Sequence, residues 1–490
     1  SDERSRRRAQ SRIDAALDII RNYRRIESEV EARTDDEDTF HPARIEFTDE
    51  QGYFIASDGK RIPLADPRVA LLIPSMGDLA ARLFAATLRS MGYNAIPMPE
   101  GNPEILKYGR AVATGKECLP LILCTGAMLD YLENRRDGAE YVAFFIVQGA
   151  GNCRLGQYPV FMRDIIKKQR LENVTTLTLM NEDGFAGLGP KFASRGITAI
   201  IASDVLDDIR SGIMAHAKDP KRGMEIFEQA FERLLRRAEE APDSFYKALN
   251  EFSSIIRKQV PPRKHISEAR YIALLGEIYV RRDHFAHKWL NKYFAQRGFI
   301  LKDAYISEWI FYVDYLLKLD LLEPDTSAKK KLERLTRIAY MKYSERRIKR
   351  ILERTGYYHY TATKIEPLLN HSKHVIPLSY KGEPGLTLGI GLHETIEKYC
   401  GIINLGPFGC MPTRLTEAVM QPEMTVGNKI EVKRKFDKKY SLPEHFDRDL
   451  IIPCLTIETD GNVYPQVIEA KLETFALQAE RMAELMGKGK

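Results

Sequence analysis

The strongest constraint on the fold of this chain is an alternation of short apolar runs with helix-like patterns that begins near residue 69. Residues 69–74 form a continuous apolar run, which is typical of a strand buried on both faces. Residues 78–91 then have the spacing of a helix that ends at Gly92, a common C-cap residue. Repeated units of this kind predict doubly wound parallel sheets whose ligands bind at the carboxyl ends of the strands. The other predicted strands are 94–97, 141–147, 174–180, 271–275, 299–303, 401–405 and 451–458.

The pattern predicts an α/β fold with two Rossmann-like doubly wound parallel-sheet domains and additional helices. The predicted domains are 66–262 and 263–490, with a boundary at Pro261-Pro262. Residues 1–65 are expected to hold an amphipathic helix, which docks on the body of the protein or on a partner, and a linker or small hairpin with a turn at Asp58-Gly59. The apolar stripe of that helix comprises Ile13, Ala16, Leu17, Ile20 and Tyr23. Helices are expected over 196–260, and the basic segment 429–439 is expected to be exposed.

Composition excludes several classes of protein. The net charge of +6, from 74 basic and 68 acidic residues, is mild, and no nucleic-acid-binding motif accompanies it, so no nucleic-acid partner is expected. No apolar run reaches about 18 residues, so no membrane span is expected. The charged N-terminus does not resemble a signal peptide, which favours a cytoplasmic location. The six cysteines include no C-x-x-C pair, which excludes a zinc ribbon, a thioredoxin-type pair and a local ferredoxin motif.

Three of the cysteines share one local setting. Cys118 lies in GKECLP (115–120), Cys153 in GNCRLG (151–156) and Cys410 in GPFGCMP (406–412). Each follows a turn-forming run and precedes a predicted helix, so a thiolate there would face unpaired helix N–H groups and the positive end of the helix dipole. This repetition favours a soft-metal site with an open coordination position. Packing explains the remaining three cysteines, which are Cys124, Cys400 and Cys454.

Other polar candidates are less specific. Gly149-Ala150-Gly151 follows a predicted strand, but the dinucleotide fingerprint requires glycine where this chain has Arg154. No P-loop motif is present. Three basic residues at loop edges would offset the charge of a cluster or would simply be solvated: Lys116, Arg154 and Arg281. Four residues are possible proton donors by type, with a surface position as the default for each: Glu117, Glu277, His284 and His393.

Four motifs in a fixed order carry a family resemblance: GKECLP (115–120), GNCRLGQY (151–158), GEIYVR (276–281) and NLGPFGCMP (404–412). Together they resemble the 2-hydroxyacyl-CoA dehydratase and double-cubane cluster protein superfamily, in its activase-related, large dehydratase-like branch. The resemblance covers roughly residues 66–485.

The resemblance implies two Rossmann-like domains and a cubane iron–sulfur cluster on Cys118, Cys153 and Cys410. The cluster would be [4Fe-4S], or part of a bridged double cubane [8Fe-9S]. Six cysteines could in principle hold the double cubane in one chain, but packing explains three of them, so a partner would have to supply the others. The resemblance also implies an ATP-hydrolysing activase with its own cluster, a second dehydratase-like subunit or second copy of this chain, and a small-molecule or acyl-CoA substrate.

These features predict an iron–sulfur subunit of an ATP-dependent, low-potential reductase or 2-hydroxyacyl-CoA dehydratase-type enzyme, working in an oxygen-poor cytoplasm. The chain shows no actin-like ATPase module, so the activase would be separate. One alternative is a non-catalytic electron-transfer or scaffold subunit, in which Cys124, Cys400 or Cys454 closes the cluster as its fourth ligand. Another is a metal-free nucleotide-binding protein in which the cysteines are incidental.

Overall fold

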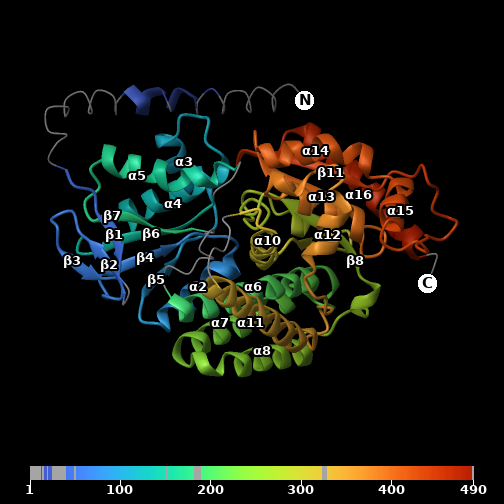
Figure 1. The fold of residues 1–490 in the computed structure, drawn as a ribbon, viewed down its shortest axis with the longest axis horizontal. Helices are drawn as coiled ribbons and strands as arrows, with labels where there is room; N and C mark the ends of the chain where they lie inside the picture. Colours follow the sequence, from blue (N-terminus) through green and yellow to red (C-terminus); the bar gives the residue numbers. More distant parts are fainter. Residues whose placement is uncertain are drawn as a thin grey trace.

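The chain folds into two four-stranded parallel sheets surrounded by helices, as the computed structural model shows (Figure 1). The structure describes residues 13, 16–18, 20–24, 40–48, 51–149, 153–180, 189–322 and 328–487. The predicted α/β class with two Rossmann-like sheets is confirmed. Part of the glycine-rich stretch 149–151 and the stretch 181–188 lie outside the described residues.

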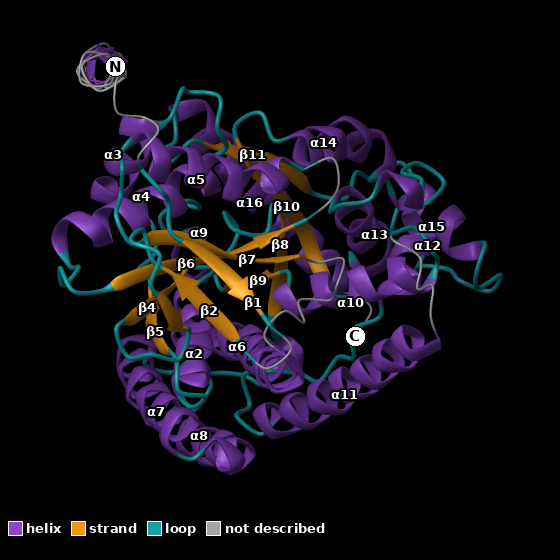
Figure 2. Cartoon of the chain, turned by 60° about the vertical axis from the view of Figure 1, so that its left-hand side comes forward, coloured by secondary structure: helices purple, strands orange, loops and turns teal. Residues whose placement is uncertain are grey.

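The first sheet has the strand order β5-β4-β6-β7, and every pairing in it is parallel. Its strands are β4 (Val69–Ile73), β5 (Asn94–Pro97), β6 (Tyr141–Gln148) and β7 (Val174–Met180). The chain reverses its direction of winding between β4 and β6, so this is the switch point at which doubly wound sheets bind ligands. The helices of this unit are α2 (Asp78–Arg89), α3 (Pro103–Val112), α4 (Leu119–Asn134) and α5 (Tyr158–Lys168). Figure 2 shows α3, α4 and α5 on one side of the strands and α2 on the other.

The second sheet repeats the same topology in the order β11-β10-β8-β9, again with parallel pairings only. Its strands are β8 (Arg270–Gly276), β9 (Phe299–Asp303), β10 (Tyr399–Pro407) and β11 (Cys454–Thr459). Its switch point lies between β8 and β10. Each of the nine residues of β10 is buried, including Asn404, whose side chain donates to the carbonyl of Thr413 at 3.2 Å.

Long helices connect the two sheets and cover them. Residues 196–260 are helical, as expected, and form α6 (Gly189–His216), α7 (Pro220–Glu240) and α8 (Phe245–Gln259). Figure 1 shows these three beside α11, below both sheets. The remaining helices are α9 (Leu290–Ala295), α10 (Ile306–Lys318), α11 (Ala328–Glu353), α12 (Ile365–Ser372), α13 (Pro384–Glu394), α14 (Met411–Glu423), α15 (Val426–Arg434) and α16 (Gln466–Gly487). Short 3-10 helices are η2 (Arg154–Gln157), η4 (Pro242–Ser244), η5 (Ile266–Glu268) and η6 (Leu378–Tyr380).

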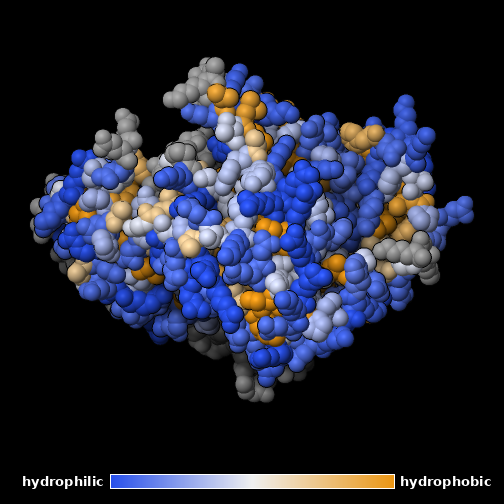
Figure 3. All heavy atoms as spheres, turned by 90° about the horizontal axis from the view of Figure 1, so that it is seen from below, coloured by the Kyte–Doolittle hydropathy of each residue, from blue (hydrophilic) through white to orange (hydrophobic). Residues whose placement is uncertain are grey.

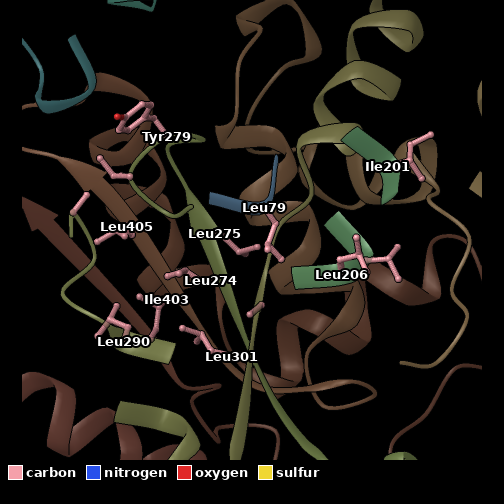
Figure 4. Packing of buried hydrophobic residues seen from close by; sticks show 14 of the residues in the cluster. Leu79, Ile201, Leu206, Leu274, Leu275, Tyr279, Leu290, Leu301, Ile403 and Leu405 are labelled. Carbon is pink, nitrogen blue, oxygen red and sulfur yellow. The ribbon is translucent and has the colours of Figure 1, made fainter. Parts of the chain in front are cut away.

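One continuous apolar cluster extends from the first sheet into the second. Figure 4 shows leucines of β8 and β9 packed with Leu405 of β10, and Leu79 of α2 and Leu206 of α6 approach from the other unit. The domain boundaries 66–262 and 263–490 therefore stay predictions, because the two sheets share a core. The face seen from below is largely hydrophilic, with small apolar patches (Figure 3). Among the described residues, no helix has both the length and the apolarity that crossing a bilayer requires.

The N-terminal part agrees with the sequence-based expectations in one respect and departs from them in another. A small antiparallel sheet consists of β1 (Arg44–Phe47), β2 (Gly52–Ile55) and β3 (Arg61–Pro63); β2 and β3 form a hairpin around the expected turn at Asp58-Gly59, whereas β1 was not expected. The described residues of the first helix carry exposed apolar side chains, with Leu17 42% and Tyr23 63% exposed. In this structure the predicted apolar stripe therefore does not cover the core, and a partner for it stays a prediction.

The basic segment 429–439 is only partly exposed, which corrects the sequence-based expectation. Lys429 is fully buried. Its Nζ lies 2.8 Å from a carboxylate oxygen of Glu397 and donates to the carbonyl of Leu392 at 2.9 Å. The side chain thus caps the C-terminal end of α13 and is neutralised there, a role that depends on tertiary contacts the sequence does not display.

Gly276 provides a test of how tightly the second switch point is packed. Its φ is +97°, and an added Cβ would lie 2.1 Å from the carbonyl oxygen of Leu405 on β10. We expect Gly276→Ala to lower the free energy of unfolding by about 3 kcal/mol or more, because both backbone strain and a clash with main chain are introduced. Gly298→Ala is the matched control, since Gly298 has a φ of +76° with nothing within 4 Å of an added Cβ, and should cost only about 1 kcal/mol. Urea unfolding of the two variants measures this difference, and equal losses would contradict the packing described.

Candidate metal centre

Cys118, Cys153 and Cys410 all lie at helix N-termini on the carboxyl side of the sheets. Cys118 is the N-cap of α4, Cys153 is the N-cap of η2 after β6, and Cys410 is the N-cap of α14 after β10. α4 and α14 have a proline in the first turn, as the sequence indicated. The Cys118 side chain is buried, that of Cys410 is half-buried and that of Cys153 is exposed.

One carboxyl group, that of Glu277 at the carboxyl end of β8, acts electrostatically on all three thiols. The charge of Glu277 contributes to a raised pKa at all three cysteines. Cys410 in turn contributes to the raised pKa of Cys153. Because such electrostatic effects fall off with distance, the fold brings two thiols of the first unit and one of the second into a common neighbourhood.

Burial dominates the protonation of these thiols. It raises the pKa of Cys118, and it raises the pKa of half-buried Cys410 to about 12. The Cys153 residue is exposed as a whole, but the protein around its thiol raises the pKa there as well, first by desolvation and then through the charge of Glu383. The helix N-termini act in the opposite direction, as expected: the N–H of Leu155 donates to Cys153 Sγ at 3.4 Å and lowers its pKa. This stabilisation is smaller than the cost of burial. All three thiols are therefore neutral near pH 7, and a metal has to displace their protons.

A second carboxyl group, Glu383, joins Glu277 beside the thiols. The N–H groups of Tyr279 and Val280 donate to Glu277 at 3.1 and 2.9 Å, and the N–H of Ile278 donates to Glu383 at 3.1 Å. One turn after β8 thus holds both side chains. Burial, followed by the charge of Glu277, raises the pKa of Glu383 to about 8, and burial likewise raises the pKa of Glu277. Glu383 is therefore mostly protonated near neutral pH.

Arg281 is the cation of this region, and it is buried rather than solvated as its loop position suggested. Only 5% of it is exposed. Its guanidinium donates to the carbonyls of Gly276 and Ala304, the latter at 3.2 Å, which ties the end of β8 to the end of β9. Its charge favours the ionised forms of Glu277 and Glu383 without overcoming their burial.

The loops that carry Cys118 and Cys153 are joined by direct contacts. The Tyr158 hydroxyl lies 2.8 Å from Cys118 Sγ, and Arg154 Nη1 donates to the carbonyl of Lys116 at 2.6 Å. Lys116 and Arg154 are otherwise exposed, as expected. Neither Tyr158 nor Glu383 was expected at the site from the sequence. Tyr158 lies at the end of the GNCRLGQY motif, whereas no local pattern marks Glu383, which reaches the site through tertiary folding.

The other proposed proton donors have structural roles in this arrangement. Glu117 accepts from the N–H and hydroxyl of Thr114 at 2.9 and 2.8 Å, which closes the turn before α4. His284 was expected at the surface but is buried, and burial lowers its pKa to about 3. His393 is half-buried, and burial lowers its pKa to about 4. A histidine that stays neutral to such low pH does not donate a proton near pH 7.

The remaining cysteines separate into two groups by position. Cys124 is buried in α4 six residues after Cys118, on the order of 9 Å further along the helix axis. Cys400 lies near the start of β10 and Cys454 begins β11, so both lie at the amino ends of their strands, whereas Cys410 follows the carboxyl end of β10. Cys400 and Pro407 are seven positions apart in β10, which is roughly 23 Å of extended chain. Cys400 and Cys454 are therefore too far away to bind the same metal as Cys410.

The donor types fit a soft metal, although the side chains are not arranged around an ion. Within the described part of the chain, no group of three or more His, Cys, Asp or Glu side chains has a geometry that could hold a metal ion. The three residues before Cys153 lie outside that part. Three convergent thiols next to helix N–H groups are nevertheless the ligand set that iron–sulfur clusters use.

Neither models of protein families, nor curated proteins, nor solved structures match this chain. The resemblance to the dehydratase superfamily therefore stays a prediction that depends on the four sequence motifs. The fold and the convergence of the cysteines are independent of it.

The carboxyl pair predicts how stability depends on pH. Glu383 has a pKa of about 8 in the folded chain against 4.5 for an ordinary glutamate, so between these values the folded state binds the proton more tightly. Its contribution to stability is thus present at low pH and is lost as pH rises through about 8, at up to ~1.4 kcal/mol per pH unit. We expect Glu383→Gln, which cannot ionise, to lose less stability than the unmodified chain between pH 5.5 and 8.5 in urea unfolding.

Glu333→Gln, at an exposed position on α11, is the control and should leave the pH dependence unchanged. An unchanged pH dependence in Glu383→Gln would show that this carboxyl group is not held protonated by the fold.

Proposed function

We propose that this chain is an iron–sulfur subunit of an ATP-dependent low-potential reductase or a 2-hydroxyacyl-CoA dehydratase-type enzyme. The observation that carries the proposal is the convergence of Cys118, Cys153 and Cys410 from two sheets around Glu277. These cysteines would hold a [4Fe-4S] cluster or half of a bridged [8Fe-9S] cluster, which supplies low-potential one-electron chemistry when bound.

The protein's own groups are suited to stabilise sulfur that has lost its proton. The N–H groups of Leu121, Leu155 and Thr413, in the first turns after the three cysteines, lower the pKa of the neighbouring thiol. In the loaded protein the same N–H groups would point toward thiolate sulfur, where hydrogen bonds to anionic acceptors are strongest. The helix N-termini thus offset part of the cost of burying negative charge.

The side chains near the thiols limit the repulsion of a negatively charged cluster. Glu383 is mostly protonated near neutral pH, so it adds little repulsion and offers an O–H donor. Arg281 adds a fixed positive charge close by. Exposed Cys153 leaves one side of the site accessible, as electron delivery from a partner or substrate entry would require.

The partners and compartment belong to the same proposal. An ATP-hydrolysing activase with its own iron–sulfur cluster would supply the electron, and a second dehydratase-like subunit or second copy of this chain would complete the enzyme. The substrate would be an acyl-CoA or another small molecule, in an oxygen-poor cytoplasm. An electron-transfer subunit with a closed cluster is the second candidate, favoured by the position of Cys124, whose raised pKa includes a contribution from Cys118.

Anaerobic purification followed by iron and sulfide analysis tests this function. We expect about four irons per chain, lost in each of the variants Cys118→Ala, Cys153→Ala and Cys410→Ala because each removes one thiolate ligand. Cys454→Ala, at the opposite edge of the sheet, is the control and should keep its iron. Loss of iron in Cys124→Ala would favour the closed cluster. A chain that binds no iron in any preparation would contradict the proposal.

A further inference from the structure

One loop connects the metal centre with the far side of the first sheet. Residues 277–289, here called the bridging loop, leave β8 at Glu277 and end at α9. Its first residue, Glu277, is the carboxyl group that acts on the three thiols, and its middle residues pack against the first unit. Arg282 is one of these middle residues, and only 1% of its side chain is exposed.

Arg282 is anchored to α6 by two buried carboxylates. Its Nη2 lies 2.9 Å from Asp207 and 3.5 Å from Asp204. Asp204 also accepts from the N–H groups of Ile306 and Ser307 at 3.0 and 2.9 Å, so it cannot follow a displaced guanidinium. Buried charges that lose their partner are strongly destabilising, which leaves Arg282 a single low-energy position.

The residues around Arg282 reinforce the same docking. Asp283 accepts from the N–H of Gly101 at 2.7 Å, and His284 Nδ1 lies 2.6 Å from Glu100 Oε1, both in the segment that follows β5. The carbonyl oxygen of Arg282 would lie 3.4 Å from a Cβ added to Gly77, in the turn after β4. The bridging loop therefore contacts the turns that follow the first two strands of the first sheet.

A second set of contacts between the two units lies nearer the surface. On α3, Arg110 donates to the carbonyl of Asp460 at 2.8 Å and to Asn462 Oδ1 at 3.2 Å, in the turn after β11. Lys288 of the bridging loop donates to the carbonyl of Gly461 in the same turn at 2.5 Å. These contacts join the two units beside α4, which carries Cys118.

We propose that Arg282 is a positioning residue that sets the distance between Cys118 and Cys153 in the first unit and Cys410 in the second. A shift of the bridging loop would move Glu277 and the carboxyl ends of β8 and β10 as one body, because β10 pairs with β8 along its length. Cys410 follows β10 directly. The relevance to a cluster depends on the proposed function, whereas the geometry does not.

The test uses the full chain without metal and a short reagent with two thiol-reactive arms, dibromobimane, which fluoresces only when both arms have reacted. Linked pairs are identified by mass spectrometry. Cross-links between Cys410 and Cys118 or Cys153 report the spacing between units. The Cys118–Cys153 cross-link is an internal control, because both cysteines belong to the first unit.

We expect Arg282→Met to lower the yield of Cys410 cross-links at least about tenfold while the Cys118–Cys153 cross-link persists. The variant removes the cation that pairs with buried Asp204 and leaves Asp207 with Arg210, and the weakened ion pairing favours displacement of the loop. Arg282→Lys, which keeps the charge, should restore part of the yield. Arg110→Ala is the second variant, at a half-buried position, and should lower the Cys410 yield by a smaller factor while circular dichroism stays unchanged.

A folded Arg282→Met protein with full Cys410 cross-linking would overturn the inference. If Arg282→Met does not fold, unchanged cross-linking in Arg110→Ala has the same meaning. Absence of any Cys410 cross-link in the unmodified chain would likewise overturn it. If the cross-links follow the expected pattern but the protein never binds iron, the proposed function is refuted and the positioning role of Arg282 is retained.

Discussion

Burial of parallel strands on both faces is the constraint on which the rest of this structure depends. All five residues of β4 and all nine of β10 are buried, and neither strand carries a charged side chain. Ionisable groups are displaced to the turns beyond the carboxyl ends. Because both sheets have the same strand order, both place a switch point there, and the elements that follow carry Cys153 and Cys410.

The same burial decides the chemistry of those turns. Helix N-termini favour thiolates, and sequence reasoning gave that effect the leading role. In the structure the cost of desolvation is larger, so the thiols and the adjacent Glu383 carboxyl group are neutral near pH 7 until a ligand compensates them. The thiols of such a site do not change their protonation near pH 7. A metal can nevertheless bind, because it replaces several protons at once. Arg281 adds the only cationic charge placed at the ends of both β8 and β9 among the described residues.

Much of the fold was predictable from the sequence, and the reasons are local. Residues 69–74 read as a buried strand because they are continuously apolar, and residues 401–405 because they are apolar apart from Asn404. The cysteine-containing turns read as helix starts because glycine precedes them and proline follows two of them. α3 was missed although Asn102 and Pro103 mark its start, with the Asn102 side chain accepting from the N–H of Ile105 at 2.9 Å. The placement of Cys118, Cys153 and Cys410 at helix N-termini was predictable from the sequence, whereas their role as metal ligands stays a prediction.

The polar interior was not predictable, because it depends on partners that are distant in sequence. Arg282 is buried because α6 supplies Asp204 and Asp207, and Lys429 is buried because Glu397 neutralises it. Glu383 belongs to the site only because Ile278 donates to it. Residue type and spacing do not reveal such distant partners. The expectation that His284 and Arg281 lie at the surface was therefore wrong.

The central claim is that two sheets bring Cys118, Cys153 and Cys410 to one metal. Anomalous diffraction at the iron absorption edge, from crystals of the anaerobically reconstituted chain, tests it most directly. The account predicts iron density bonded to the Sγ atoms of all three cysteines, with Cys400 and Cys454 unbound. Iron bonded elsewhere, or a loaded chain in which any of the three thiols stays free, would contradict it.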